Sequence, residues 1–304
     1  MKKTTRINLC VIGAGRVGTT ISYTLAEKEL PNIKLKAISS KSMESLNRAK
    51  KILGSKAAGV IFTRENSKAV LLANCILICT PDDVINSVCR DIFKDKSKDF
   101  KNYYAIHFSG SKSLEVLNSA RAAGAEIASI HPLKSFASIE EAIKSLPGTI
   151  FGITYSSTES KKMAEFLVKS LGGGIIEVEN NKKPLYHAAA CVASNYLVTL
   201  INYAVLIHKK MGIKPEDSLK GLMGLVESTV SNIKKMGTEK SLTGPIARGD
   251  VGTIKEHVKS FNEFFSKEDS ALYRMMGSET IKIAYQNKWI KESTVDELKE
   301  ILKE

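Results

Sequence analysis

The sequence predicts an N-terminal α/β domain with a mostly parallel, doubly wound sheet, followed by an all-α C-terminal domain. Short apolar runs alternate with helical periodicity up to about residue 180. These runs are continuously apolar, as in strands that are covered on both faces. From residue 184 onward we find only helical patterns. We therefore expect one domain over residues 1–180 and a second over residues 181–304.

In the first domain, each expected strand leads through a turn into a helical pattern. The run INLCVI is apolar and β-branched, and a glycine turn and a helix over 17–29 follow it. A polar helix over 42–53 follows the second strand, and a helix over 158–171 joins the last two. The expected strands are 7–12, 35–39, 59–62, 75–80, 103–109, 125–130, 149–155 and 175–179.

The second domain is predicted from five helical patterns. Asp250 and Ser270 are residue types that start helices, and Gly212 is suited to end one. The expected helices are 185–211, 215–235, 250–265, 268–286 and 292–303.

Composition and charge limit the class of protein and of partner. Hydrophobic residues make up 43% of the 304 residues and charged residues 25%, which excludes disordered and collagen-like chains. The formal charge is +13, but the excess lysine is spread in short pairs, without a dense basic stretch that carries interleaved aromatics. We expect a small anionic metabolite as partner, and no nucleic acid.

Cysteine usage and the N-terminal stretch predict the compartment. The five cysteines are odd in number and lack paired spacing, and Cys10, Cys75 and Cys79 lie in expected strands as reduced core residues. We expect no secretory signal, because the start, MKKTTRINLC, runs directly into a strand. The expected compartment is therefore the cytoplasm.

One long apolar run raises the question of a membrane. From Ala188 to Ile207 there is no charge over 20 residues, which is long enough to span a bilayer. Polar residues interrupt the run, and a helix that is apolar all round also suits the centre of a helical domain or a subunit interface. We expect no membrane partner, and a homodimer formed through the C-terminal helical domain.

A glycine-rich turn after the first strand predicts a dinucleotide site. It fits G-x-G-x-x-G, and the strand before it and the helix after it are the context that this pattern requires. The first glycine permits a tight turn, the second lets a pyrophosphate approach the backbone, and the third lets the helix pack closely. The alternative is a purely structural turn. The motif consists of Gly13, Ala14, Gly15, Arg16, Val17 and Gly18.

The end of the second strand predicts the type of dinucleotide. An NAD site requires an acidic residue there, but this chain has Ser39, Ser40 and Lys41, with no carboxylate before Glu44. Because hydroxyls and a cation suit a 2′-phosphate, we expect NADP(H) in preference to NAD(H). We expect Arg16 to reach the same phosphate. The alternative is that these serines cap the next helix.

Further residues lie at the carboxyl ends of the later strands, where ligands bind in open sheets. Thr80 and Pro81 follow the fourth strand, and Ser109 ends the fifth. We expect these three residues to contact the ribose and nicotinamide.

Motifs along the chain carry a resemblance to known families. Gly110-Ser111-Lys112 and Ile130-His131-Pro132 are similar to the glycine–serine–lysine turn and the His-Pro step of prephenate dehydrogenases. His187–Ala190 and Leu242–Asp250 resemble an uncharacterised group of Rossmann-like oxidoreductases whose second domain is a domain of unknown function. Over residues 7–260 the chain is similar to Rossmann dehydrogenases with a helical second domain, such as pyrroline-5-carboxylate reductase.

The resemblance implies a Rossmann NAD(P)-binding domain and a substrate and dimerisation domain similar to the helical C-terminal domain of 6-phosphogluconate dehydrogenase. The chain also departs from its relatives. It has Ser194-Asn195 where prephenate dehydrogenases carry serine-histidine, and no arginine lies between Arg121 and Arg248. The Gly-Ser-Gly-Pro step of the proline reductases is missing. The resemblance therefore implies a reaction class and leaves the substrate open.

Hydride transfer to a carbon that bears oxygen or nitrogen needs a group that moves a proton, and histidine suits this near pH 7. His131, at the carboxyl edge of its strand, is the first candidate, and His187, which opens the long helix, is the second. Ser111 and Asn195 would orient the substrate oxygen, and Arg248 would hold a carboxylate or phosphate. Each residue has a structural alternative in a turn, a cap or a tight loop.

We therefore expect an NADP(H)-dependent oxidoreductase that acts on a small imine, keto or hydroxy acid at a cleft between the domains. A non-catalytic NADP(H)-binding sensor or regulatory protein is the main alternative, and reduction with a deazaflavin is a third. No residue cluster has metal-ligand spacing and no nucleophile elbow occurs, so we expect neither metal nor acyl-transfer chemistry.

Overall fold

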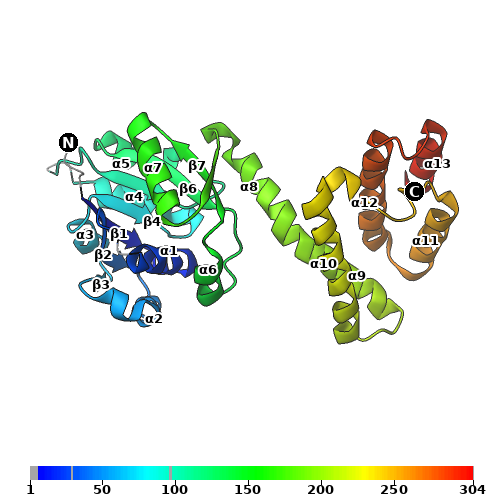
Figure 1. Cartoon of the computed structure of the whole chain (residues 1–304), viewed down its shortest axis with the longest axis horizontal. Coiled ribbons are helices and arrows are strands. Elements are labelled where there is room, and N and C mark those ends of the chain that lie inside the picture. The colour runs from blue at the N-terminus through cyan, green and yellow to red at the C-terminus, as the bar shows by residue number, and fades with distance from the viewer. Residues whose placement is uncertain (1–5, 29, 96–97, 304) are drawn as a thin grey trace. The chain divides into compact units, whose positions relative to one another are not determined.

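The computed structural model describes residues 6–28, 30–95 and 98–303. Residues 1–5, which belong to the stretch in which we expect no secretory signal, lie outside this range. The chain forms two compact units, Met1–Tyr196 and Leu197–Glu304, and each is described by itself (Figure 1). The sheet ends near the boundary expected at residue 180, and the first unit continues into the helix that follows it.

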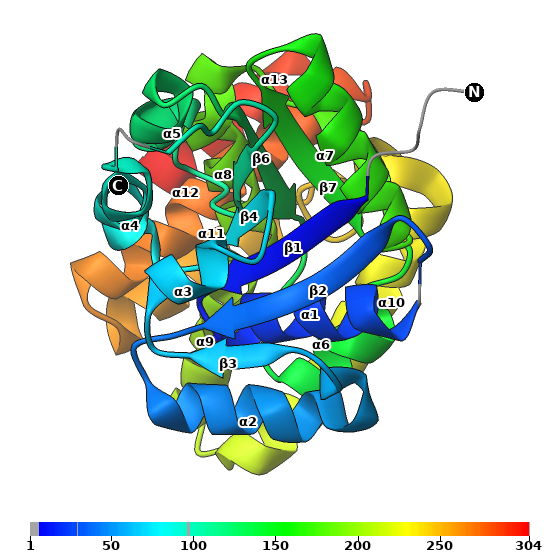
Figure 2. The same ribbon diagram turned by 90° about the vertical axis from the view of Figure 1, so that its left-hand side faces the viewer.

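The first unit is built on one sheet of eight strands in the order β3-β2-β1-β4-β5-β6-β7-β8. All neighbouring strands are parallel except β6 and β7, which confirms the expected mostly parallel, doubly wound sheet. Because the chain passes from β1 to β2 and β3 on one side and to β4 on the other, the topology switches between β1 and β4 (Figure 2). The strands are β1 Ile7–Ile12, β2 Ile33–Ser39, β3 Ile61–Thr63, β4 Cys75–Ile78, β5 Tyr104–His107, β6 Glu126–Pro132, β7 Ile150–Tyr155 and β8 Gly174–Glu177.

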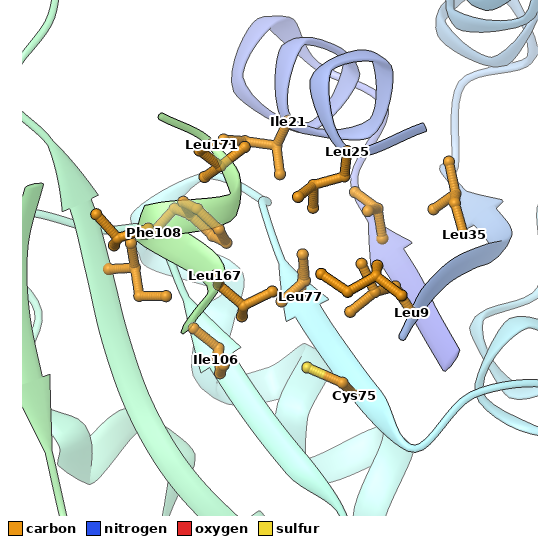
Figure 3. Packing of buried hydrophobic residues seen from close by; sticks show 14 of the residues in the cluster. Leu9, Ile21, Leu25, Leu35, Cys75, Leu77, Ile106, Phe108, Leu167 and Leu171 are labelled. Atoms are coloured by element: carbon orange, nitrogen blue, oxygen red, sulfur yellow. The ribbon is translucent and has the colours of Figure 1, made fainter. Parts of the chain in front are cut away.

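Helices cover both faces of this sheet, and a separate apolar core lies under each group. One core joins the sheet to α1, α2 and α7, and Figure 3 shows Ile21 and Leu25 of α1 packed toward Leu77 of β4. The second core joins the other face to α3, α4 and α5. Each fully buried aliphatic side chain contributes about 1.5–3 kcal/mol. The helices are α1 Arg16–Glu27, α2 Met43–Leu53, α3 Asn66–Val70, α4 Ile85–Phe93, α5 Asn118–Ala122, α6 Ile139–Ser145 and α7 Thr158–Ser170.

The expected helix over 185–211 is divided in the structure. The segment begins as α8 (Lys183–Cys191), passes through the π-helical turn η5 (Val192–Tyr196) and continues as α9 (Leu197–Lys210). It is long and apolar enough to span a membrane by length and composition alone, with a mean hydropathy of 1.7 over its most apolar window. None of that window is buried in the described part of the chain.

The second unit consists of helices with a small apolar core between α11, α12 and α13. Asp250 caps α11 by accepting a hydrogen bond from the amide of Thr253, as expected. The expectation that Ser270 starts a helix was wrong, because Ser266 caps α12 one turn earlier and Ser270 is buried inside the helix. The remaining helices are α10 Pro215–Lys240, α11 Val251–Phe264, α12 Lys267–Gln286 and α13 Glu292–Lys303.

Candidate functional site

The glycine turn between β1 and α1 requires glycine at two positions for packing and is open at the third. Gly13 has φ of +109°, and a Cβ there would lie 2.6 Å from the carbonyl oxygen of Cys79. A Cβ at Gly18 would overlap the carbonyl oxygen of Gly13. A Cβ at Gly15 would meet no atom within 4 Å, so the space in front of this residue is open to a ligand. This division of roles is the one that the motif predicts.

A cavity of about 360 Å³ lies in front of this turn. The helix α1 begins without a side-chain cap, so its first amides and the positive end of its dipole are available to an anion in the cavity. The hydroxyl oxygen of Thr80 is buried and has no hydrogen-bond partner among the described residues, so it is available to a ligand group. These features suit an anionic group such as the pyrophosphate of a dinucleotide. The cavity lining includes Gly13, Ala14, Gly15, Ser40, Lys41, Asn66, Thr80 and Pro81.

Two residues predicted to contact the cofactor point elsewhere. Ser39 is fully buried and donates its hydroxyl hydrogen to Asn66 Oδ1 at 2.7 Å, so it supports the strand end from inside. Arg16 donates to the carbonyl oxygen of Phe136 at 3.3 Å and is not among the residues that line the cavity. The residue of this segment that caps α2 is Ser42, whose hydroxyl oxygen accepts a hydrogen bond from the amide of Ser45. Arg64, which the sequence did not single out, donates to the carbonyl oxygen of Lys41 at 3.1 Å.

A network of hydroxyls connects the turn after β4 with the loop after β5. Ser109 donates to Asp82 Oδ2 at 2.6 Å, and Ser111 donates to the same oxygen at 3.0 Å. Asp82 therefore binds the neighbouring loop through its carboxylate. The two predicted serines are held by one carboxylate at the carboxyl edge of the sheet.

The two candidate histidines come together at this edge. The rings of His131 on β6 and His187 on α8 are edge to face with centroids 5.6 Å apart. Gly110 lies between them, since a Cβ there would be 2.6 Å from His187 Nδ1 and 2.7 Å from His131 Nε2. Tyr186 Oη lies 3.2 Å from His131 Nδ1, and Cys191 Sγ lies 3.7 Å from His187 Nε2. His187 Nδ1 is buried without a partner in the described residues.

The protonation of His131 follows from its surroundings. Burial, and then the charges of His187 and Lys183, lower the pKa of His131 to about 4, against a smaller opposing effect of Asp82. Burial lowers the pKa of the neighbouring His107 to about 3, with Lys183 adding to the effect. Burial also raises the pKa of Tyr186 to about 12. At neutral pH, His131 and Tyr186 are therefore uncharged hydrogen-bonding groups.

A second cavity, of about 540 Å³, opens beside the histidines. It is bounded by the loop after β6 and by α8 and η5, and Asn195 is among its lining residues. Arg248 lies in the other unit, on the loop before α11, and its predicted role stays a prediction. Within the residues that the structure describes, no group of three or more histidine, cysteine, aspartate or glutamate side chains is placed to hold a metal ion.

The fold and this edge of the sheet define a Rossmann-like protein, and residues 1–132 match the Rossmann-like domain. Residues 149–280 match the domain of unknown function DUF2520. The chain therefore combines a Rossmann-like domain with a DUF2520 domain, as the sequence motifs implied. No curated protein matches the chain in sequence.

Solved structures share the fold over nearly the whole chain. A protein from Thermotoga maritima is 23% identical, with a TM-score of 0.71, covering 92% of this chain and 99% of that one. A candidate NADP oxidoreductase from Bacteroides fragilis is 17% identical, with a TM-score of 0.69 and coverages of 93% and 100%. A pyrroline-5-carboxylate reductase from Coxiella burnetii is 16% identical, with a TM-score of 0.59 and coverages of 98% and 99%.

Proposed function

We propose that the protein is an NADP(H)-dependent oxidoreductase that transfers hydride to or from a small imine, keto or hydroxy acid. The observation that carries the proposal is that the cavity in front of the glycine turn and the histidine pair share one sheet edge, joined through Asp82, Ser109 and Ser111. Proteins of the same fold include a pyrroline-5-carboxylate reductase and a candidate NADP oxidoreductase, which supports the reaction class. The nicotinamide would supply the hydride.

Preference for NADP(H) over NAD(H) is supported by the ribose end of the cavity. Ser40 and Lys41 line it, and the Arg64 side chain reaches the backbone of Lys41. Aspartate and glutamate are absent from the described residues that line this cavity. Cations and hydroxyls stabilise a 2′-phosphate, whereas a carboxylate would repel it.

The chain's own residues would bind and orient the substrate and move its proton. His131 and His187 both line the cavity of about 540 Å³, so a substrate bound in it would meet both side chains. His131 is uncharged at neutral pH, so it would act as a hydrogen-bonding group or proton acceptor, supported by Tyr186. Asn195 and Ser111 would orient the substrate, and Arg248 would bind its anionic group.

Titration and turnover with one set of proteins test this proposal. Wild-type protein should bind NADPH more tightly than NADH in calorimetry, and should oxidise NADPH with members of a panel of keto acids and cyclic imines. His131→Ala and His187→Ala should each lower turnover by about 100-fold while NADPH binding stays intact. Tight binding without turnover on any panel member would favour the sensor function, and failure to bind either dinucleotide would refute both.

We also propose that the protein is a cytoplasmic homodimer, with the second copy covering the long helix. Large apolar side chains are exposed along three consecutive helices, among them Leu185 on α8 (74% exposed), Val198 on α9 (68%) and Leu225 on α10 (65%). A soluble monomer rarely exposes so many large apolar side chains along consecutive helices. All five cysteines are unpaired, as in reducing compartments.

Solution mass tests this assembly. Light scattering at micromolar concentration should give twice the chain mass, and Val198→Asp should lower it to one chain because a buried carboxylate disfavours the interface. The matched control is Met43→Asp, an exposed apolar residue on α2, which should leave the mass unchanged. A monomeric wild-type protein, or one that sediments only with lipid vesicles, would contradict the dimer.

A further inference from the structure

A lysine is buried beneath the histidine pair. Lys183, the first residue of α8, is 1% exposed, and its Nζ donates to the carbonyl oxygen of Ser109 at 3.1 Å and to Ser129 Oγ at 2.8 Å. Both partners are uncharged oxygens. The side chain does not line the cavity beside the histidines, so it does not reach a substrate there.

This placement disfavours the folded state, so packing alone does not account for it. A buried ammonium group loses its hydration, and an apolar side chain of similar volume is often as stable in such a place. A cation at the N-terminus of a helix also opposes the helix dipole. Burial lowers the pKa of Lys183 to about 8, with Asp82 acting in the opposite direction, so the group is mostly charged at pH 7.

The two partners of Lys183 lead to both halves of the candidate site. Ser129 is two residues before His131 on β6, so both side chains lie on the same face of that strand. Ser109 precedes Gly110, against which both histidine rings pack, and its hydroxyl donates to Asp82 in the turn beside the dinucleotide cavity. The ammonium group therefore holds α8, the histidine strand and the loop after β5 together, and the Ser109 hydroxyl connects that loop to Asp82 in the turn after β4.

We propose that Lys183 is the positioning residue of the histidine pair: it fixes the start of α8 against Ser109 and Ser129, and its charge favours the neutral form of His131. The other groups that face His131 are the ring of His187 and the phenol of Tyr186 from α8, His107 from β5 and Asp82 from the turn after β4. Lys183 is a lysine whose charge lowers the pKa of this ring, and it is buried. The effect of Lys183 on turnover rests on the proposed function, but its effect on the pKa of His131 does not.

Histidine titration by NMR in the full chain tests the proposal without any cofactor or substrate. The chain has five histidines, and the signal that disappears in His131→Gln identifies His131. In Lys183→Met the His131 pKa should rise by at least about half a unit, or about threefold in proton affinity, because the neighbouring positive charge is gone. Lys183→Gln removes the charge but keeps a donor toward Ser109, so it should give the same rise if the methionine variant fails to fold.

The matched control is Lys182→Met, at the adjacent position, where the lysine is exposed and pairs with Glu179 at 2.6 Å. It should leave the His131 pKa unchanged. In a working enzyme, Lys183→Met should also lower kcat about tenfold with the NADPH dissociation constant within about twofold of wild type. An unchanged His131 pKa in the Lys183 variants, or an equal rise in the control, overturns the proposal. Absence of NADPH binding by the wild type would instead refute the proposed function and leave the NMR result standing.

Discussion

Replacing Gly18 with alanine is expected to abolish NADPH binding and to destabilise the first unit. A methyl group at this position would overlap the carbonyl oxygen of Gly13, which is backbone and cannot rotate away as a side chain would. Gly13 is itself confined, because its amide donates to the carbonyl oxygen of Ser39 at 2.8 Å. The glycine turn must therefore open, and overpacking of this kind costs about 1–3 kcal/mol of unfolding free energy.

Two matched variants separate the fold from the binding site. Gly252→Ala places the new methyl 3.7 Å from its nearest neighbour, so both stability and NADPH binding should be retained. In Gly15→Ala the methyl meets no protein atom, so stability should be retained while NADPH binding weakens at least about tenfold from lost access to the backbone. Urea denaturation and calorimetric titration give the two quantities. NADPH affinity at the wild-type level in both Gly15→Ala and Gly18→Ala would contradict the placement of the dinucleotide.

Most of the fold was predictable because most of its helices and strands carry a local signal in the sequence. Buried parallel strands such as β1 and β4 are continuously apolar. A G-x-G-x-x-G turn between a strand and a helix is typical of a dinucleotide-binding fold. The antiparallel pairing of β6 and β7 lacks such a signal, since strand direction depends on the path of the chain between them. The π-helical turn Val192–Tyr196 was also not visible in the periodicity, because it adds a residue within an evenly apolar run.

The site was predictable only in part, because sequence position fixes where a residue lies but not where its side chain points. His131 and His187 were found because both lie at predicted element ends. Ser39 occupies the expected position but points into the protein, and Arg16 bonds to a distant loop. Lys183 was missed because a Lys-Lys pair on a basic chain usually means a solvated surface.

Replacing Gly110 with alanine is expected to lower turnover by about 100-fold while leaving NADPH binding intact. The new methyl group would lie within 2.8 Å of both histidine rings, so at least one ring must move. The rings are not free to move without loss, since Tyr186 holds one and Cys191 contacts the other. Displacement of a reacting group by about 1 Å is enough for such a loss in rate. Steady-state kinetics and calorimetric titration of the same preparation give the two quantities.

Gly152→Ala provides the comparison, because the three atoms nearest to its methyl group would all belong to the Tyr186 side chain. If the histidine pair moves the proton and Tyr186 only supports it, this variant should lose less activity than Gly110→Ala. Tyr186→Phe should then resemble Gly152→Ala, since both remove the contact with His131 Nδ1 and leave His187 in place. Equal losses in all three variants would instead make Tyr186 the group on which the chemistry depends, and full activity in Gly110→Ala would remove the histidine pair from the mechanism.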